Sequence, residues 1–422
     1  MAELDIWMGG KPVGVLDGSD RRALEITYDE RWLADPQATP LSVSLPLGEE
    51  RHRGERVAAH LWGLLPDNEQ VIQRWAGAYQ CSASDVVGLL VGVGADVAGA
   101  AQYLPRGFAA YDVAAGAVEP VSNDEVAALL RGLRRDSGAW HPNAQSGWSL
   151  AGAQPKLALA YDELTRGWAI PSGSRATTHI LKPAIVGLDD HDLNEHLCLA
   201  AARALGLRAA DSKVVRFGSE QALVVRRYDR PLIDGVVVRV HQEDFCQALG
   251  VHPQRKYQSD GGPTVDDLVG VLGSAGSQRD DIGHLLRAVA YNWLILCTDA
   301  HAKNYSLLLS GRQVRLAPLY DLASAPPYDD HPKTLRMAQK VGGEYRPTII
   351  SRRHWERLAS MARVDVDELL HDIESMAARL PEALSNAVST SDLTGDDRSR
   401  ASVIAASIAG WATSCRSALC AR

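Results

Sequence analysis

Three polar residues in the C-terminal half have the types and spacing that phosphoryl transfer requires. In the segment CTDAHAKNYSLLL (297–309), Asn304 follows Asp299 at the fifth position, and Asp321 lies beyond the next predicted strand. An Asp in such a loop can orient an attacking hydroxyl and accept its proton. Asn and Asp oxygens are hard ligands of the kind that Mg²⁺ prefers. The pattern favours a phosphotransferase centre, although each of these residues alone is more often an ordinary loop or cap residue.

The residues on either side of this segment are expected to hold it rigidly. The stretch HLLRAVAYNWLILC before Asp299 is apolar almost all round, which predicts a buried helix ending at Thr298–Asp299. The segments YSLLLS and QVRL that follow Asn304 have the character of strands. Loops on rigid supports are where catalytic groups concentrate.

A cation for nucleotide phosphates is available earlier in the chain. Lys182 lies in the predicted strand THILKP, and Glu195 on the following predicted helix could pair with it. A Lys within a strand usually belongs to a solvated face. The order of the segments favours the phosphate-binding role for this pair. Lys182 and Glu195 lie in a strand-rich region, and the helical region with the Asp299 segment follows it.

Composition narrows the class of protein. The chain has 422 residues, a net charge of -8 and a pI of about 5.9, so a basic field over the whole chain for nucleic acid is excluded. The six Cys show neither CxxC nor zinc spacing, which indicates reduced thiols in a cytoplasm. The start lacks a signal-peptide pattern. The weakly polar stretch 86–101 is too short to span a bilayer, so no membrane partner is expected.

The order of predicted elements gives an α+β fold in three parts. Residues 1–135 combine strands and helices and include a hairpin at Gly9–Gly10, residues 136–229 are strands around one helix, and residues 230–422 are mainly helical. The more local expectations are a helix break at Pro66, an N-cap at Ser122 or Asn123, a strand in SLAGAQPKLALAYD, a helix in HQEDFCQALG and a turn in SDGGP (259–263).

A family resemblance covers nearly the whole chain. The sequence resembles the HipA family of bacterial serine/threonine-kinase toxins, and AGAQPK and TDAHAKN are specific to that group. The matching segments, in order, are PLSVSLPL (40–47), LLPDN (64–68), SLAGAQPKLAL (149–159), THILKP (178–183), NEHLCLAAARALGL (194–207), RRYDR (226–230), HQEDFCQALG (241–250), KYQSDGGP (256–263), TDAHAKNYS (298–306) and PLYDLASA (318–325).

The resemblance implies a two-lobed, protein-kinase-like fold with ATP and Mg²⁺ as cofactors. Its N-terminal lobe would be mixed and β-rich, with an extra N-terminal subdomain, and its C-terminal lobe all-helical. Asp299 matches the family's catalytic Asp, and Asn304 and Asp321 match its magnesium ligands. Lys182 matches its ATP-phosphate lysine. Lys303 could neutralise charge on the transferred phosphate.

The resemblance also assigns the residues around the nucleotide. His301 is expected to shape the catalytic loop beside the nucleotide. RRYDR matches the segment that joins the lobes, where Arg226 and Tyr228 flank the adenine; Arg226 departs from the acidic residue of the family pattern. SLAGAQPK replaces a Gly-rich loop, since the chain has no GxGxxG. The loop residues expected at the phosphates are Ser149, Ala151, Gly152, Ala153, Gln154 and Lys156.

Ser149 matches the family's autophosphorylation serine, where a phosphate would inactivate the enzyme. The implied function is the toxin of a toxin–antitoxin pair that phosphorylates an aminoacyl-tRNA synthetase. Its partner would be a HipB-like helix-turn-helix antitoxin, through which the kinase reaches DNA. Two alternatives stay open: a nucleotide- and antitoxin-binding corepressor without significant kinase activity, and a kinase for a small molecule or lipid.

Overall fold

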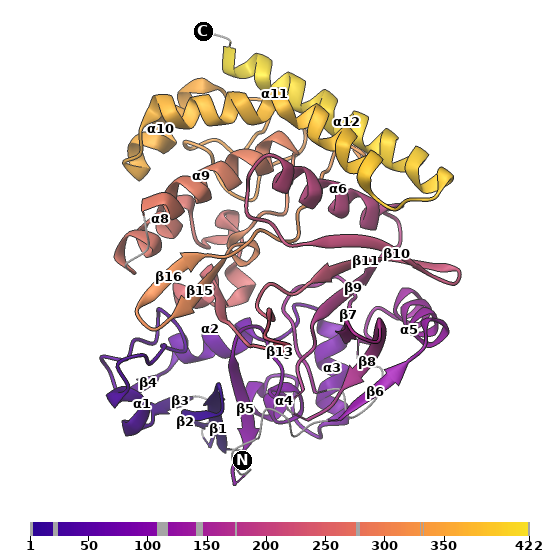
Figure 1. Ribbon diagram of the computed structural model, residues 1–422. Coiled ribbons are helices and arrows are strands. Elements are labelled where there is room, and N and C mark those ends of the chain that lie inside the picture. The colour runs from indigo at the N-terminus through magenta and orange to yellow at the C-terminus, as the bar shows by residue number, and fades with distance from the viewer. Residues whose placement is uncertain are drawn as a thin grey trace. The chain divides into compact units, whose positions relative to one another are not determined.

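The computed structural model describes residues 3–19, 24–107, 117–140, 147–173, 175–275, 279–329, 331 and 333–420 (Figure 1). Contacts divide the chain into two compact units, each assembled from separate stretches. Unit 1 contains Met1–Pro183, Val215–Gln254 and Leu308–Gln313, and unit 2 contains Ala184–Val214, Arg255–Leu307 and Val314–Arg422. The predicted boundaries after residues 135 and 229 stay predictions.

The N-terminal part of unit 1 is an antiparallel sheet of order β4-β3-β2-β1-β5. Its strands are β1 (Glu3–Met8), β2 (Lys11–Asp17), β3 (Glu25–Tyr28), β4 (Arg51–Arg53) and β5 (Ala101–Pro105). Alternate side chains of β1 are buried, which gives the sheet one core face. Gly9 and Gly10 both have positive φ, as a two-residue hairpin turn requires, so the predicted hairpin is confirmed.

Four helices accompany this sheet: α1 (Glu30–Ala34), α2 (Glu55–Gly63), α3 (Glu69–Ala78) and α4 (Val86–Val93). The predicted break at Pro66 is confirmed, because it lies between α2 and α3. Asn68 caps α3, and its side chain accepts the backbone N–H groups of Gln70 and Val71. The segment 64–68 is thereby fixed at the start of a helix.

A second sheet has the order β10-β11-β9-β7-β8-β6, and its strands from β11 to β6 belong to unit 1. Its strands are β6 (Val118–Val121), β7 (Leu157–Asp162), β8 (Gly167–Pro171), β9 (His179–Pro183), β10 (Ser212–Phe217) and β11 (Glu220–Arg226). Helix α5 (Asn123–Arg135) packs on β9 and β11 and begins with a capping box at Ser122, one of the two predicted caps. The predicted strand from Ser149 forms only from Leu157, and residues 149–156 are irregular.

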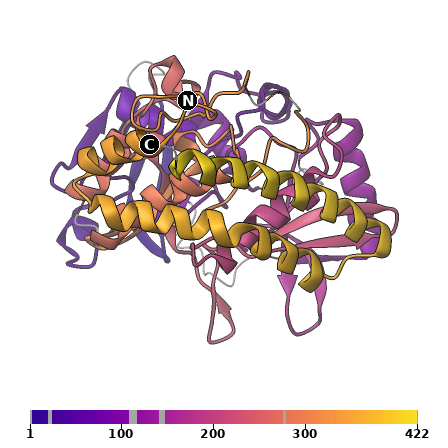
Figure 2. The ribbon, with the colours of Figure 1, turned by 90° about the horizontal axis from the view of Figure 1, so that it is seen from above.

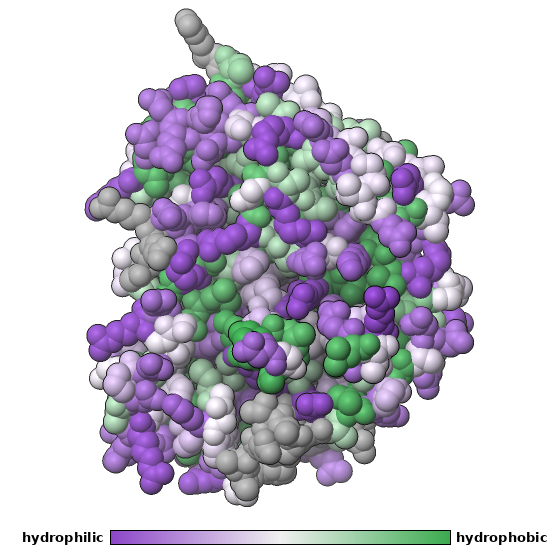
Figure 3. Space-filling model, in the orientation of Figure 1, coloured by the Kyte–Doolittle hydropathy of each residue, from purple (hydrophilic) through white to green (hydrophobic). Residues whose placement is uncertain are grey.

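A short hairpin exposes apolar side chains on unit 1. Strands β12 (Leu232–Ile233) and β13 (Val236–Val237) join through Asp234 and Gly235, which both have positive φ. The side chains of Leu232, Ile233 and Val236 are 43%, 51% and 57% exposed. Figure 3 shows apolar groups gathered where Figure 1 labels β13.

The predicted helix in HQEDFCQALG is only half right. Residues His241–Asp244 form strand β14, and α7 (Phe245–Ala248) follows, because Asp244 caps α7 through a capping box with Gln247. In β14, Glu243 is buried, and its Oε1 accepts the N–H of Val43 at 2.7 Å while its Oε2 lies 2.5 Å from Ser42 Oγ. The strand thereby holds the segment PLSVSLPL.

We expect Glu243 to make stability depend on pH. Burial raises the pKa of Glu243 to about 8, so the folded state holds a proton that the unfolded state releases near the ordinary value of 4.5. The contribution of Glu243 to the free energy of unfolding is therefore lost as the pH rises from about 5 to about 8. The melting temperature of Glu243→Gln should fall less than that of the wild type over this range. Parallel curves for the two proteins would contradict this.

Unit 2 is built on long helices. They are α6 (His191–Ala204), α8 (Val265–Ser274), α9 (Arg279–Leu294), α10 (Arg352–Ala362), α11 (Val366–Thr390) and α12 (Gly395–Cys420). Figure 2 shows α11 and α12 side by side. The 3-10 helix η3 (Ala302–Asn304) is followed along the chain by the strands β15 (Ser306–Ser310) and β16 (Gln313–Leu316).

One described helix, α12, is long and apolar enough to cross a membrane by length and composition. Its buried residues recur at helical spacing, from Ala401 through Ile404 and Ile408 to Cys415, and it packs on α11, α6 and α9. Such a stripe is typical of a core helix with one face toward its own unit.

Candidate active site

Asp299 and Asn304 lie on one tight turn of unit 2. The preceding helix α9 ends at Leu294, earlier than predicted, because Leu296 takes the left-handed conformation with φ 51°. The His301 N–H donates to the Asp299 carbonyl at 2.8 Å, and Asn304 Nδ2 donates to the same carbonyl at 2.7 Å. The turn thus fixes the Asn304 side-chain amide against the backbone of Asp299.

Buried groups anchor this turn from below. Lys303 and His301 are both 4% exposed, whereas the Asp299 side chain is 67% exposed. The Tyr320 hydroxyl donates to the Lys303 carbonyl at 2.6 Å. Burial raises the pKa of Tyr305, so that phenol stays neutral, and it accepts a hydrogen bond from Asn292. The turn therefore has a rigid, buried support and exposes the Asp299 carboxylate to solvent.

The loop that carries Asp321 is bonded to the same support. The Ala325 N–H donates to the Leu296 carbonyl at 3.1 Å, and Ser324 Oγ donates to the Ile295 carbonyl at 2.5 Å. Asp321 itself has φ 51°, a conformation that costs free energy in a residue other than Gly and that clusters at functional sites. Asp299, Asn304 and Asp321 therefore lie on two loops of unit 2 that share hydrogen bonds.

Helix α6 is fixed to the Asp321 loop as well. Asn194 Nδ2 donates to the Ser324 carbonyl at 2.7 Å, and the Ser324 N–H donates back to Asn194 Oδ1 at 3.0 Å. Glu195, the next residue, is 1% exposed. Lys182 is buried on β9, between β11 and β7 in unit 1. Since the two residues belong to different units, the pairing of Lys182 with Glu195 stays a prediction.

Ser149 is fully buried in unit 1. Its Oγ donates to the Leu64 carbonyl at 2.7 Å, and its N–H donates to the Asp96 carbonyl at 3.0 Å. Both contacts hold the start of the 149–156 loop against the segment 64–68 and the residues before β5. The loop must leave this position before any kinase can reach the Ser149 hydroxyl.

The rest of the 149–156 loop folds around Lys156. Lys156 Nζ donates to the Ala151 carbonyl at 2.6 Å and lies 4.9 Å from the centroid of the Trp140 ring. Gly152 has φ 103°, and a Cβ there would lie 2.7 Å from Lys156 Nζ. The Gly152 carbonyl accepts the Asp67 N–H at 3.1 Å. Ala153 is exposed and Gln154 half-buried, so the middle of the loop faces solvent.

A buried charge network holds the segment RRYDR. Arg227, Asp229 and Arg230 are almost fully buried, whereas Arg226 is exposed and Tyr228 half-buried. The sequence did not predict this network. The ion pairs join Arg227 and Arg230 to Asp229 and to Asp96, and Arg239 to Asp96.

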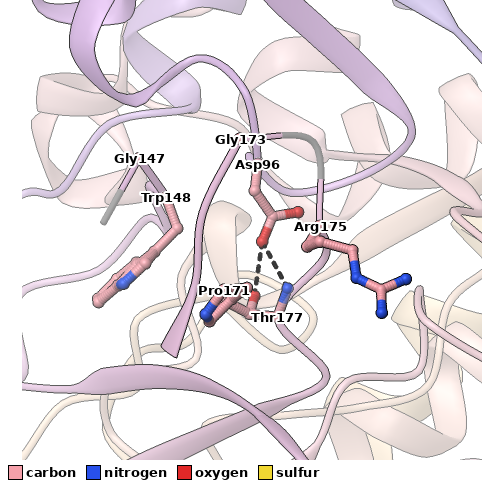
Figure 4. A pocket seen from close by; sticks show the side chains of 7 residues that line it. All are labelled: Asp96, Gly147, Trp148, Pro171, Gly173, Arg175 and Thr177. Carbon is pink, nitrogen blue, oxygen red and sulfur yellow. Dashed lines mark hydrogen bonds between the residues drawn. The ribbon is translucent and has the colours of Figure 1, made fainter. Parts of the chain in front are cut away.

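Asp96 is the acceptor at the centre of this network. Figure 4 shows its carboxylate with two hydrogen bonds from Thr177, one from the N–H at 2.9 Å and one from the hydroxyl at 2.7 Å. Burial alone would raise the pKa of Asp96, but Arg230 and the other arginines hold it below its usual range. The carboxylate is therefore ionised, and its partners fix the backbone of RRYDR.

A small hollow lies beside this network in unit 1. It has practically no enclosed space even for a water molecule, so it is too small to hold a nucleotide. Its lining residues are Asp96, Gly147, Trp148, Pro171, Gly173, Arg175 and Thr177 (Figure 4).

The predicted ligand set fits magnesium by its chemistry. Among the described residues, no three His, Cys, Asp and Glu side chains gather as a metal-binding cluster. The predicted set of one amide and one carboxylate oxygen suits an ion that takes its other ligands from water and phosphate, as Mg²⁺ does.

Comparison with known proteins identifies relatives along the whole chain. The HipA N-terminal domain matches residues 4–104, and the HipA-like C-terminal domain matches residues 148–384. A putative kinase of Sinorhizobium fredii, Y4mE, is 36% identical over 97% of both chains. The serine/threonine-protein kinase toxin HipA of Shewanella oneidensis is 27% identical over 91% of this chain and 89% of its own.

A solved structure agrees with these matches. The complex of Shewanella oneidensis HipA with HipB and its operator DNA contains a chain that superimposes with a TM-score of 0.83 at 25% identity, over 97% of this chain and 96% of that one. The structural match therefore covers both units.

Proposed function

The chain belongs to the HipA family and is a serine/threonine-protein kinase, and from this premise we propose that the Asp299 turn is its catalytic centre. The carrying observation is the pair of hydrogen bonds that His301 and Asn304 make to the Asp299 carbonyl. They fix the backbone that carries the exposed Asp299 carboxylate beside the amide that would bind the metal. ATP is the phosphate donor in this proposal.

The reaction follows from these placements. The Asp299 carboxylate accepts the proton of a substrate Ser or Thr hydroxyl. The hydroxyl oxygen forms a bond to the γ-phosphorus while the bond from phosphorus to the β,γ-bridging oxygen breaks, and ADP leaves with that electron pair. Magnesium held by Asn304 and Asp321 would neutralise charge on the phosphates. Lys303 sits in the same turn and adds positive charge.

Unit 1 supplies the nucleotide contacts in this proposal. Lys182 binds ATP phosphates from β9, and the 149–156 loop offers backbone N–H groups around Gly152. Arg226 and Tyr228 flank the adenine. The buried network supports this last role, because it anchors Arg227 and Asp229 and leaves the preceding Arg226 and the intervening Tyr228 more exposed.

The partners are inferred from the relatives. Shewanella oneidensis HipA forms a complex with HipB and operator DNA. We propose that this chain is likewise the toxin of a pair, bound in the cytoplasm by a HipB-like antitoxin that contacts the DNA. The net charge of -8 supports an indirect role at DNA. Six free cysteines accord with a reducing compartment.

The substrate that the resemblance favours is an aminoacyl-tRNA synthetase. The direct test incubates the purified chain and MgATP with each host synthetase and follows phosphate incorporation by intact mass. One synthetase modified in minutes, and unmodified by Asp299→Asn, would support the proposal. Transfer to no synthetase, with transfer to a small molecule, would favour the alternative kinase. Antitoxin binding without any transfer would favour a corepressor.

We expect phosphorylation of Ser149 to switch the enzyme off. A phosphate cannot keep the Ser149–Leu64 hydrogen bond in a fully buried position, so the 149–156 loop must move and carry Lys156 with it. Ser149→Asp should lower the rate of phosphate transfer by about 100-fold or more, in line with the loss of one positioned catalytic contact. Ser149→Ala should keep the activity and lose the autophosphorylation. Full activity in Ser149→Asp would contradict this switch.

A further inference from the structure

Asp299 has a hydrogen-bond partner outside its own turn. The Tyr257 hydroxyl donates to Asp299 Oδ1. Both residues belong to unit 2, and Tyr257 comes from the segment KYQSDGGP, some forty residues earlier in the chain. The proton-accepting group of the proposed reaction therefore already receives one donor from the protein.

Packing on the catalytic turn holds the Tyr257 ring in place. The ring meets the buried His301 imidazole edge to face, with centroids 4.8 Å apart and planes at 88°. The backbone next to Tyr257 also contacts the catalytic turn, because the Ala302 N–H donates to the Lys256 carbonyl at 3.3 Å. Tyr257 therefore contacts the catalytic turn at a carboxylate and an imidazole, and the neighbouring Lys256 adds a backbone contact.

The glycine pair of SDGGP forces the chain into this position. The predicted turn is confirmed, since the Gly262 N–H donates to the Tyr257 carbonyl at 2.9 Å and Gly261 has φ 77°. A Cβ at Gly262 would lie 1.9 Å from the Arg255 carbonyl oxygen and 2.6 Å from that of Tyr257. Only glycine lets the chain close so tightly behind the tyrosine.

A second anchor fixes the other side of this turn. The Lys340 N–H donates to Gln258 Oε1 at 2.7 Å, and Gln339 Nε2 donates to the Pro263 carbonyl at 3.0 Å. Residues on both sides of the glycine pair are thus bonded to one further segment of unit 2. The support for Tyr257 is built into the fold and extends beyond the glycine turn.

We infer that Tyr257 is a positioning residue for Asp299, an assignment that rests on the proposed function. With its side chain 67% exposed, Asp299 would otherwise sample several rotamers in solvent. The Tyr257 hydroxyl holds Oδ1 and leaves the second carboxylate oxygen to accept the substrate proton. Misplacement of a catalytic group by about 1 Å can cost roughly 100-fold in rate, so this one hydrogen bond affects turnover more than binding.

The test compares Tyr257→Phe, which removes only the hydroxyl, with Tyr257→Leu, which also removes the ring. Tyr345→Phe is the matched control, since it deletes a phenol hydroxyl elsewhere in unit 2. The readouts are kcat and the KM for MgATP, measured as phosphate transfer to the chain itself or to an unphosphorylated protein substrate. Melting temperatures show whether each variant folds.

We expect Tyr257→Phe to lower kcat by about 10- to 100-fold, with the KM for MgATP within about twofold and the melting temperature unchanged. In the Asp299→Asn background, Tyr257→Phe should lower kcat little further, because the Tyr257 hydroxyl and the Asp299 carboxylate act as a unit. If Tyr257 served folding alone, Tyr257→Phe would lower kcat by the same factor in the wild-type and Asp299→Asn backgrounds.

The outcomes separate this inference from the proposed function. Absence of transfer by the wild type would reject the proposed function itself. An active wild type with an unimpaired Tyr257→Phe would reject the positioning role alone, and a loss confined to Tyr257→Leu would assign the effect to ring packing. A faster Tyr257→Phe would show that the hydroxyl blocks the substrate, which also overturns the inference.

Discussion

Replacement of Asp299 with Asn is expected to lower the rate of phosphate transfer by about 100- to 10,000-fold, the range for loss of a general base. The change removes the charge and the proton acceptor but keeps the shape of the side chain. The carbonyl bonds from His301 and Asn304 involve only the backbone of residue 299, so the turn should keep its fold. The measurement is the initial rate of phosphate incorporation at saturating MgATP.

Asp266→Asn is the control for this experiment, because Asp266 is an exposed carboxylate in the first turn of α8 in the same unit. It should retain the wild-type rate. If Asp299→Asn transferred phosphate within about threefold of the wild type, another group would have to accept the proton, and the role of the turn would be wrong.

Replacement of Asp96 with Ala is expected to cost about 3–5 kcal/mol of unfolding free energy, the usual result of removing one partner from a buried ion pair. Among the described residues, Asp229 would be the one carboxylate still paired with Arg230 and Arg227, and Thr177 would lose the acceptor of two hydrogen bonds. Denaturant unfolding measures the difference. The exposed Asp124→Ala, in the same unit, is the control and should cost little.

This effect should also depend on pH. Burial opposes ionisation of Asp96 and Asp229, but the arginines hold the pKa of both below the ordinary value. The stability that these two carboxylates contribute is therefore complete at a pH above the ordinary pKa of Asp. It is lost as the pH falls through their lowered pKa in the folded protein. The gap in stability between wild type and Asp96→Ala should narrow in acid. A gap that stays constant down to the acid transition would contradict the ionised network.

The sequence predicted those parts of the site that are local. The Asp299 turn is one example, because apolar flanks and hydrogen bonds within six residues define it. The Gly9–Gly10 hairpin and the Ser122 cap are others, since turn and cap chemistry depend on adjacent residues. For each of these the signal lies within a few positions.

Contacts between distant segments were beyond sequence reasoning. Ser149 was expected to lie beside phosphates, but the bond to Leu64 that buries it spans 85 positions. Asp96 meets Arg230 across 134 positions, and Tyr257 meets Asp299 across 42. Residue types alone do not specify such pairs. HQEDFCQALG shows the same limit, because the partners that bury Glu243 lie two hundred residues away.

The most direct test of the catalytic centre is the intact mass of fully dephosphorylated protein after incubation with MgATP, taken beside Asp299→Asn and Ser149→Ala. The proposed function predicts a gain of one phosphate in the wild type and none in either variant. A gain in Ser149→Ala would keep the kinase centre and move the modified residue. A gain in Asp299→Asn equal to that of the wild type would contradict the assignment of Asp299 as the catalytic residue.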